Sequence, residues 1–313
     1  MSGFALLCLL YFAQAQAYLI DPAVLPLSRP AAIAIAVGYL LVTWVVYDRV
    51  CRSPLARSPR ALAAVVAVLI AAEAWSLSRV FSGRGAFMMF GAALGTVMVA
   101  NVLMVIIPGQ RELVRAKLEG REPDAAPGAR GKQRSVHNTY FTLPVVFAMI
   151  SNHYAMTYGA RYNWAVLIAM SFAGACIRAW FVARHTPAPG RNRFAAVPAV
   201  LGLLTLASLA IALAPPFDTG GGAPVRTPAI DRARVQLIVE QRCVPCHSRN
   251  PTQPGFISPP NGIVLENIDQ VLAHLPDVRE QVALRAMPLG NLTGMTEDER
   301  SMVLMWIGHG AQP

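Results

Sequence analysis

The hydrophobic residues of this chain are gathered in long blocks separated by short polar segments. Seven blocks occupy residues 2–19, 31–47, 61–78, 86–107, 140–158, 162–183 and 197–214. Each approaches or exceeds the ~17–25 residues that a helix needs to cross a bilayer. Because backbone groups in lipid must find partners within their own segment, runs of this length predict helices. We therefore expect an all-α protein with about seven membrane spans.

The last hundred residues follow a different pattern, being polar, rich in proline and glycine, and without a long apolar run. The segment "PPFDTGGGAPVRTP" at 215–228 begins with prolines that end a helix, and its three glycines are typical of a flexible tether. We expect a transmembrane domain over 1–214, a linker over 215–228 and a small α-helical domain over 229–313.

The chain has a net charge of +10 although only 14% of its residues are charged, and the distribution of its basic residues indicates how the predicted spans are oriented. Fourteen Lys and Arg residues fall in the segments 48–60, 108–139 and 184–196, whereas the alternate segments 20–30, 79–85 and 159–161 hold four. The positive-inside bias then places the N-terminus in the cytoplasm and the segment after residue 214 on the outer side. The basic charge is a topology signal, and no nucleic-acid partner is expected.

The first apolar block also has a feature of a secretory signal peptide, namely the small residues "AQAQA" at 13–17. A signal peptide begins with a positively charged region, and no Lys or Arg precedes Asp21. We expect block 2–19 to be retained as a helix.

The strongest chemical motif is Cys243-Val-Pro-Cys246-His247, the C-x-x-C-H pattern of c-type haem attachment. Two thiols three positions apart can form thioethers with the two haem vinyl groups, and the adjacent imidazole then lies beneath the iron. A thioredoxin-like pair needs a βαβ context, and a zinc site needs further ligands, yet no other Cys lies in this region. The motif predicts one covalent haem c held by Cys243 and Cys246, with His247 as an axial ligand.

Two methionines compete for the opposite axial position, where methionine raises the reduction potential. Thr296 to Glu299 reads as a capping box that opens a helix over 297–308. Met295 then precedes the cap and should pack against the helix, whereas Met287 lies in an irregular loop and is free to reach iron. Met287 is the predicted ligand. Met302 and Met305 are expected in the core, and His274 and His309 are weaker candidates.

Several polar residues fall within the apolar blocks, where they are functional candidates by default. Glu73 and the pair Asn152 and His153 each lie a few residues before the predicted outer end of a span, roughly 7–8 Å deep. They either face one cavity or satisfy polar groups of neighbouring helices. Asn101 is read as a contact between helices and Arg178 as a side chain that snorkels toward the membrane surface, whereas Arg134 and His137 are read as interfacial residues. Cys8, Cys51 and Cys176 are read as small apolar fillers.

Several stretches resemble one family, the membrane-bound bacterial urate oxidases (urate hydroxylases). They include "FSGRGAF" at 81–87, "GTVMVANVLMVIIPGQRELV" at 95–114 and "KQRSVHNTYFTLPVVFAMISNHY" at 132–154. The resemblance implies a bacterial inner-membrane protein of purine catabolism with a periplasmic cytochrome c domain. It implies oxidation of urate to 5-hydroxyisourate, with electrons passing through the haem to a respiratory cytochrome or terminal oxidase.

The resemblance also implies Cys243, Cys246, His247 and Met287 as the haem-binding residues. Family members extend further at the N-terminus by at least one span, so an N-terminal part is expected to be missing.

Urate is a planar anion, so its site should offer hydrogen-bond donors and a group that takes a proton. His153 is suited to act as a general base because the reference pKa of a histidine side chain is about 6.5. Asn152 can pair with an amide edge of the ring, and Glu73 can orient His153. Two alternatives stay open: a membrane-anchored cytochrome c without a substrate site, and a quinol-linked haem c enzyme.

Overall fold

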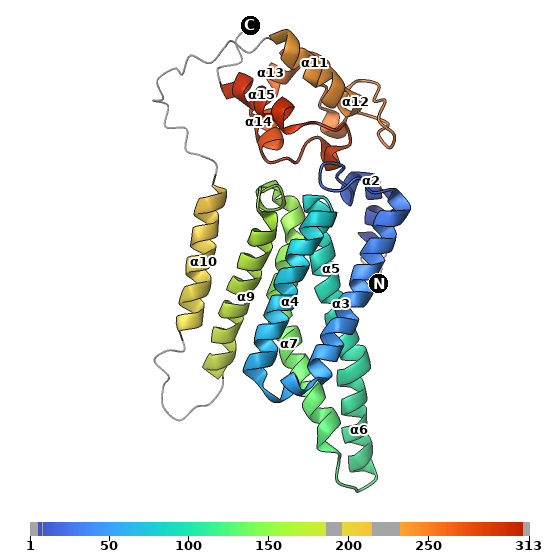
Figure 1. Ribbon diagram of the computed structural model, residues 1–313, viewed down its shortest axis with the longest axis vertical. Helices are drawn as coiled ribbons and strands as arrows, with labels where there is room; N and C mark the ends of the chain where they lie inside the picture. The colour runs from blue at the N-terminus through green and yellow to red at the C-terminus, as the bar shows by residue number, and fades with distance from the viewer. Residues whose placement is uncertain (1–5, 8, 186–195, 215–231, 309–313) are drawn as a thin grey trace. The chain divides into compact units, whose positions relative to one another are not determined.

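The structure is a computed structural model that describes residues 6–7, 9–185, 196–214 and 232–308. All regular elements in these residues are helices, as expected (Figure 1). The chain divides into two compact units, Ser28–Ala214 and a second unit that combines Met1–Leu27 with Pro215–Pro313. The predicted linker 215–228, Cys8 and His309 lie outside the described residues.

Long helices that stand side by side form the first unit (Figure 1). Four stretches are long and apolar enough to cross a membrane: α3 (Arg29–Arg52), α4 (Pro59–Val80), the continuous helix Gly83–Leu118, and α9 (Asn163–His185). The helix α10 (Val197–Leu213) is apolar but shorter, at 17 residues. By length and composition, four of the seven predicted spans are therefore borne out.

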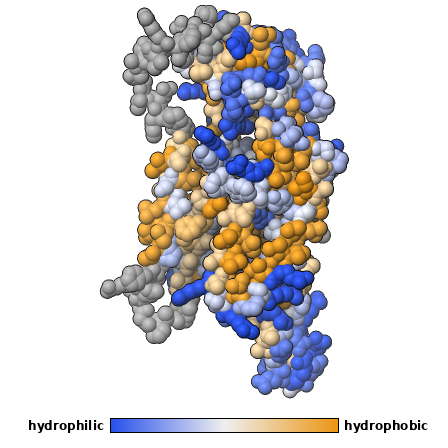
Figure 2. Space-filling view, in the orientation of Figure 1, coloured by the Kyte–Doolittle hydropathy of each residue, from blue (hydrophilic) through white to orange (hydrophobic). Residues whose placement is uncertain are grey.

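Many large apolar side chains are exposed on the surface of these helices. Leu41, Val68 and Leu203 are each more than 60% exposed, and Figure 2 shows hydrophobic residues spread over the visible face of the bundle. Apolar exposure on this scale is unfavourable in water and suits contact with lipid. Side chains on this surface contribute much of the high apolar content of the first unit.

Serines start three of the helices. Ser28 and Ser58 precede a proline in the first helical turn, and each side chain accepts a backbone N–H three residues on at 3.4 Å. Ser82 caps α5 (Gly83–Asn101) through the N–H of Gly85 at 3.0 Å. These are sequence-encoded helix starts.

The helix α5 lies at the centre of the bundle, where it packs against α3, α4 and α7. It continues through η3 (Val102–Ile106) into α6 (Ile107–Leu118), which α7 (Ala125–Ile150) follows after a short turn. The prediction that the segment 108–139 is a loop was therefore wrong, because most of this segment is helical. Its Arg, Glu, Lys and Ala residues are good helix formers, and Pro108 falls in the first turn of α6, where proline is tolerated.

The block 140–158 also differs from its prediction as one span. After α7 ends at Ile150, the chain forms η4 (Ser151–His153) and α8 (Ala155–Tyr158). The Ser151 hydroxyl donates to the carbonyl of Ala148 at 2.6 Å, an example of a side chain competing for helix backbone groups. Asn152 and His153 consequently lie on a turn beyond the helix.

In the other unit, the described part of block 2–19 has helical residues at 6–7 and then the short helices η1 (Leu9–Ala13) and α2 (Ala15–Tyr18), rather than one long helix. Gln14 separates them, and the Asp21 carboxylate then accepts the N–H of Ala23 at 2.9 Å. Gly290, at φ +55°, touches this segment so closely that a Cβ would collide with the carbonyl oxygen of Ala17. The N-terminal segment therefore packs within the C-terminal unit.

The C-terminal helices are α11 (Arg232–Arg242), α12 (Val244–His247), η5 (Pro260–Gly262), α13 (Ile268–Ala273), α14 (Leu275–Ala283), η6 (Leu289–Asn291) and α15 (Glu297–Gly308). Their core gathers Val235, Val271, Met295, Val303 and Trp306. The predicted helix over 297–308 is confirmed within the described residues, with its start at Glu297.

Candidate functional site

The imidazole of His247 is held by a backbone carbonyl. Its Nδ1 lies 2.9 Å from the carbonyl oxygen of Ile263. Because a carbonyl can only accept, Nδ1 must carry the proton, which leaves Nε2 as the lone-pair nitrogen. Ligating histidines are oriented in this way, so the geometry of His247 fits an axial ligand of iron.

The two cysteines of the motif lie on the same turn of chain as His247. The N–H groups of Cys246 and His247 both donate to the carbonyl of Cys243, at 3.2 and 2.9 Å. Both thiols are free. Burial raises the pKa of Cys243 to about 11, with a further contribution from Cys246, so this thiol is protonated at neutral pH. Two reduced thiols beside an oriented imidazole make a donor set that fits a covalent haem.

A zinc site would need additional ligands beside the motif. Within the described ranges, no three His, Cys, Asp or Glu side chains are grouped so that they could hold a metal ion.

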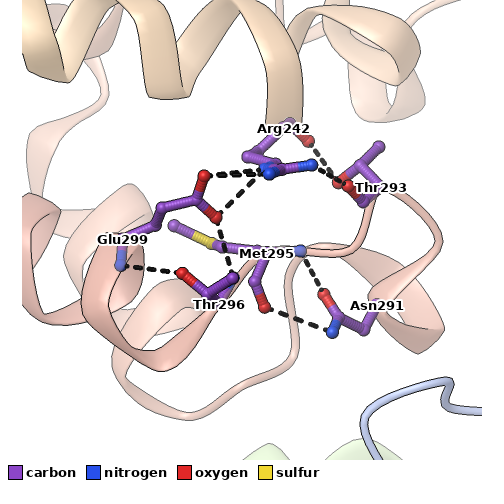
Figure 3. Close-up of polar contacts among 6 residues, drawn as sticks. All are labelled: Arg242, Asn291, Thr293, Met295, Thr296 and Glu299. Carbon is purple, nitrogen blue, oxygen red and sulfur yellow. Dashed lines mark hydrogen bonds and ion pairs between the residues drawn. The ribbon is translucent and has the colours of Figure 1, made fainter.

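Met295 and Met287 have different surroundings. Met295 is 4% exposed in the hydrophobic core, and its backbone N–H and carbonyl both bond to the side chain of Asn291, at 2.8 and 3.2 Å (Figure 3). Met287 is half-buried in an irregular segment. The predicted packing role of Met295 is confirmed, and Met287 keeps its place as the candidate ligand.

The Met287 segment is fastened by Arg300, a residue that the sequence did not single out. Arg300 is 6% exposed, and its Nη1 donates to the carbonyls of Met287 and Val282, each at 2.8 Å. The signal available in the sequence was a basic residue on the apolar side of an amphipathic helix.

A second Arg ties the haem motif to the Met295 segment (Figure 3). Arg242, directly before Cys243, donates through Nε and Nη2 to the carboxylate of Glu299 at 2.9–3.2 Å, and its Nη1 donates to the carbonyl of Thr293. Thr296 and Glu299 exchange the two hydrogen bonds of the predicted capping box, at 2.8 and 3.2 Å. These hydrogen bonds connect the C-x-x-C-H motif to the loop that follows α14.

The three polar residues predicted as a site in the helical bundle, Glu73, Asn152 and His153, do not line a common cavity in the described residues. Glu73 is 8% exposed, and its carboxylate accepts a hydrogen bond from Thr43 at 2.7 Å. It lines an apolar cavity of about 200 Å³ together with Tyr39, Tyr47 and Phe141. His153 is exposed, and the Asn152 carbonyl lies 3.5 Å from Arg84 Nη2. Neither Asn152 nor His153 is among the described residues that line the Glu73 cavity.

The structure instead brings together a polar centre, by which we mean Tyr47, Asn101, Arg134, His137 and Asn138. The Tyr47 hydroxyl lies 2.7 Å from Nδ1 of His137, and Nδ2 of Asn101 donates to the Tyr47 hydroxyl at 3.2 Å and to Asn138 Oδ1 at 2.8 Å. These residues come from α3, α5 and α7. Asn101 joins α5 to α3 and α7, so its reading as a helix contact is confirmed. The reading of Arg134 and His137 as interfacial was wrong, because α7 begins at Ala125 and carries both into the bundle.

Arg134 is 2% exposed and forms an ion pair with Asp48 at 2.8 Å, and its guanidinium lies 4.8 Å from the centre of the Tyr47 ring. A cavity of about 620 Å³ borders this residue, lined by Cys51, Arg52, Met104, Val105, Pro108, Gly109, Glu112, Pro127, Arg130, Gln133 and Arg134, with Ala56. We call it the basic cavity. Cys51 is 5% exposed in a hydrophobic cluster with Tyr47 and Phe141, which fits its reading as a small apolar filler, and its Sγ lies 3.8 Å from His137 Nδ1.

The unit Ser28–Ala214 is thus a helical bundle with a buried polar centre, and four of its helices are long and apolar enough to cross a membrane. The family model described as urate oxidase N-terminal matches residues 1–212, and the chain belongs to this family. No curated protein and no solved structure matches the chain.

Proposed function

We propose that the protein oxidises urate to 5-hydroxyisourate and passes the electrons through a haem c to the respiratory chain. Membership of the urate oxidase N-terminal family over residues 1–212 supports the substrate. The hydrogen bond that fixes His247 beside two free thiols is the observation that carries the haem. Cys243 and Cys246 would hold the group covalently, and His247 and Met287 would bind its iron.

The reaction balances with water as the co-reactant. Urate and water give 5-hydroxyisourate, two protons and two electrons. A bound haem c supplies a one-electron acceptor, so each urate requires two successive transfers. A downstream respiratory cytochrome or terminal oxidase takes these electrons.

The location follows from the charge pattern. The Arg-rich segments would lie in the cytoplasm of a bacterium, the helices in the inner membrane and the C-terminal unit in the periplasm, where haem c is attached.

The assignment of His153 as general base, with Asn152 and Glu73 as its partners, remains a prediction from the sequence. The exposed side chain of His153 offers little enclosure for a substrate. The polar centre is the more enclosed alternative.

One observation favours a second function, a quinol-linked haem c enzyme. The cavity beside Glu73 is lined mainly by Val42, Val46, Val66, Leu69, Ile70, Leu94 and Val97, with Thr43 and Tyr47 as further polar neighbours. An apolar slot with a buried carboxyl group suits a hydrophobic redox carrier better than an anion.

The purified full chain with its haem distinguishes these functions. Under anaerobic conditions urate should reduce the haem, whereas a short-chain quinol should not. Reduction by quinol alone would favour the quinol-linked enzyme, and reduction by neither would leave an electron carrier. The haem itself should stay with the polypeptide in denaturing electrophoresis, and full haem staining of a Cys243→Ala/Cys246→Ala double variant would refute covalent attachment.

A further inference from the structure

We infer that the polar centre and the basic cavity beside it bind the substrate as a planar anion that carries both carbonyl oxygens and N–H groups. The identification of that anion as urate rests on the proposed function. The binding site would thus lie among α3, α5 and α7, and not at the turn that carries His153.

Two buried polar atoms of the polar centre lack a partner. Nη1 of Arg134 and Oδ1 of Asn101 have no hydrogen bond within the described part of the chain. Asn101 is fully buried and Arg134 is 2% exposed. Buried polar groups are nearly always paired, so a donor and an acceptor without partners, on two side chains that both contact Tyr47, indicate a missing ligand.

The orientation of the Asn101 amide is fixed by its neighbours. Nδ2 of Asn138 donates to the carbonyl of Met98 at 3.0 Å, so Oδ1 of Asn138 must face Asn101. Nδ2 of Asn101 then occupies that contact and the Tyr47 hydroxyl, which leaves Oδ1 of Asn101 for a donor from elsewhere. The ligand therefore has to offer an N–H or O–H group.

Arg134 needs a hydrogen-bond acceptor from the ligand, whereas Asn101 needs a donor. Its Nη2 is taken by Asp48 Oδ1 at 2.8 Å, while Nη1 needs an acceptor. Both unpartnered groups belong to side chains that contact Tyr47, one through its hydroxyl and one over its ring. A flat ligand beside Tyr47 with an N–H on one edge and a carbonyl on another would satisfy both.

The charge of the basic cavity suits an anion. Arg52, Arg130 and Arg134 line it against one carboxylate, Glu112. Glu112 is already paired with Arg115 and Arg121 at 2.7 and 2.6 Å, and Asp48 is shared between Arg52 and Arg134. Cationic walls of this kind raise the local concentration of an anionic ligand.

The phosphodiester of a lipid headgroup would match the charge but not the hydrogen bonding, and inorganic phosphate, which keeps an O–H group at neutral pH, lacks a flat ring that could lie beside Tyr47. At neutral pH a phosphodiester has acceptors only, and it would leave Oδ1 of Asn101 unpaired. An oxidised purine has both kinds of group around one flat ring. The observations therefore favour the purine.

The test is equilibrium dialysis of radiolabelled urate against the purified full chain. Arg134→Lys keeps a positive charge beside Asp48 but removes Nη1, and we expect urate binding at least tenfold weaker. Arg111→Lys is the matched control on α6, where the side chain is exposed and does not line the basic cavity, and should bind as the wild type does. Equal affinity in both variants would overturn the site while leaving urate oxidation by the wild type untouched.

A competition on the wild-type protein removes any dependence on the folding of a variant. Xanthine, which has N–H and carbonyl groups, should displace labelled urate, whereas the same concentration of phosphate should not. Displacement by phosphate as effective as by xanthine would overturn the inference, as would loss of binding in His153→Ala with retention in Arg134→Lys. Wild-type protein that neither binds urate nor is reduced by it would overturn the proposed function as well.

Discussion

Arg300 reaches across the C-terminal unit from α15 and donates a hydrogen bond to the carbonyl oxygen of Met287 at 2.8 Å. The same Nη1 atom donates to Val282 at the end of α14. A buried guanidinium thus fixes the backbone of the residue that we propose as the second iron ligand. In the proposed function Met287 would bind the metal, and Arg300 would only position the Met287 segment.

Met287→Ala should abolish the methionine–iron absorption band of the oxidised protein. It should cost little stability, because Met287 is half-buried outside the core cluster. Met295→Ala should keep the band but lower the free energy of unfolding by about 2–5 kcal/mol, since it leaves a cavity in the core. Absorption spectra and denaturant titrations give both quantities, and the opposite pattern would move the ligand to Met295.

Arg300→Lys should weaken or shift the same band without removing the haem. Lysine cannot reproduce the paired contacts of Arg300, and loss of a charged hydrogen bond to a buried carbonyl costs about 1–3 kcal/mol. The reduction potential should move as the Met287 segment loosens. Arg285→Lys is the matched control, because Arg285 pairs with Glu297 at an exposed site. If both variants had the wild-type spectrum and potential, Arg300 would have no positioning role.

The carboxyl group of Glu299 should make the C-terminal unit sensitive to acid. Burial raises its pKa, but hydrogen bonds from Arg242 and from the Thr296 N–H outweigh this and leave the pKa below its usual range. A group with a lowered pKa in the folded state stabilises the fold above its unfolded pKa of about 4.3, and this stability is lost as the pH falls through the folded value. Unfolding followed from pH 7 to pH 3 should show a smaller loss for Glu299→Gln than for the wild type. Glu297→Gln, at an exposed ion pair, should retain the full pH dependence, and identical curves for wild type and Glu299→Gln would contradict the assignment.

The orientation of the chain can be tested with a reporter fused after Pro313. The Arg-rich segments predict that an enzyme active only in the periplasm will be active at this position. Reagents added outside intact cells should not reach cysteines introduced in the segment 119–124 between α6 and α7. A reporter active in the cytoplasm would contradict both the charge pattern and the site of haem attachment.

Local signals in the sequence predicted local structure well. The capping box fixed the start of α15 at Glu297 because its two hydrogen bonds involve residues only three positions apart. The same signal placed Met295 in the core. The C-x-x-C-H motif likewise depends on one turn of chain, so its three residues lie together without help from the rest of the fold.

The polar centre could not be read in the same way. Tyr47, Asn101 and His137 lie on three helices, and their contacts depend on the register between helices, which an apolar block does not specify. Hydropathy also placed the start of span five near residue 140, although α7 begins at Ala125. Arg134 and His137 therefore looked interfacial, while their side chains in fact pack against Tyr47.

In the proposed function, electrons from urate leave the protein through the haem. The most direct measurement is an anaerobic titration of the fully oxidised full chain with urate, followed by the absorption of the reduced haem. Half an equivalent of urate should reduce all of the haem, because each urate gives two electrons and each haem takes one, and no hydrogen peroxide should form when air is admitted with excess urate. Haem that stays oxidised without air, together with peroxide that appears in step with urate loss, would contradict the account.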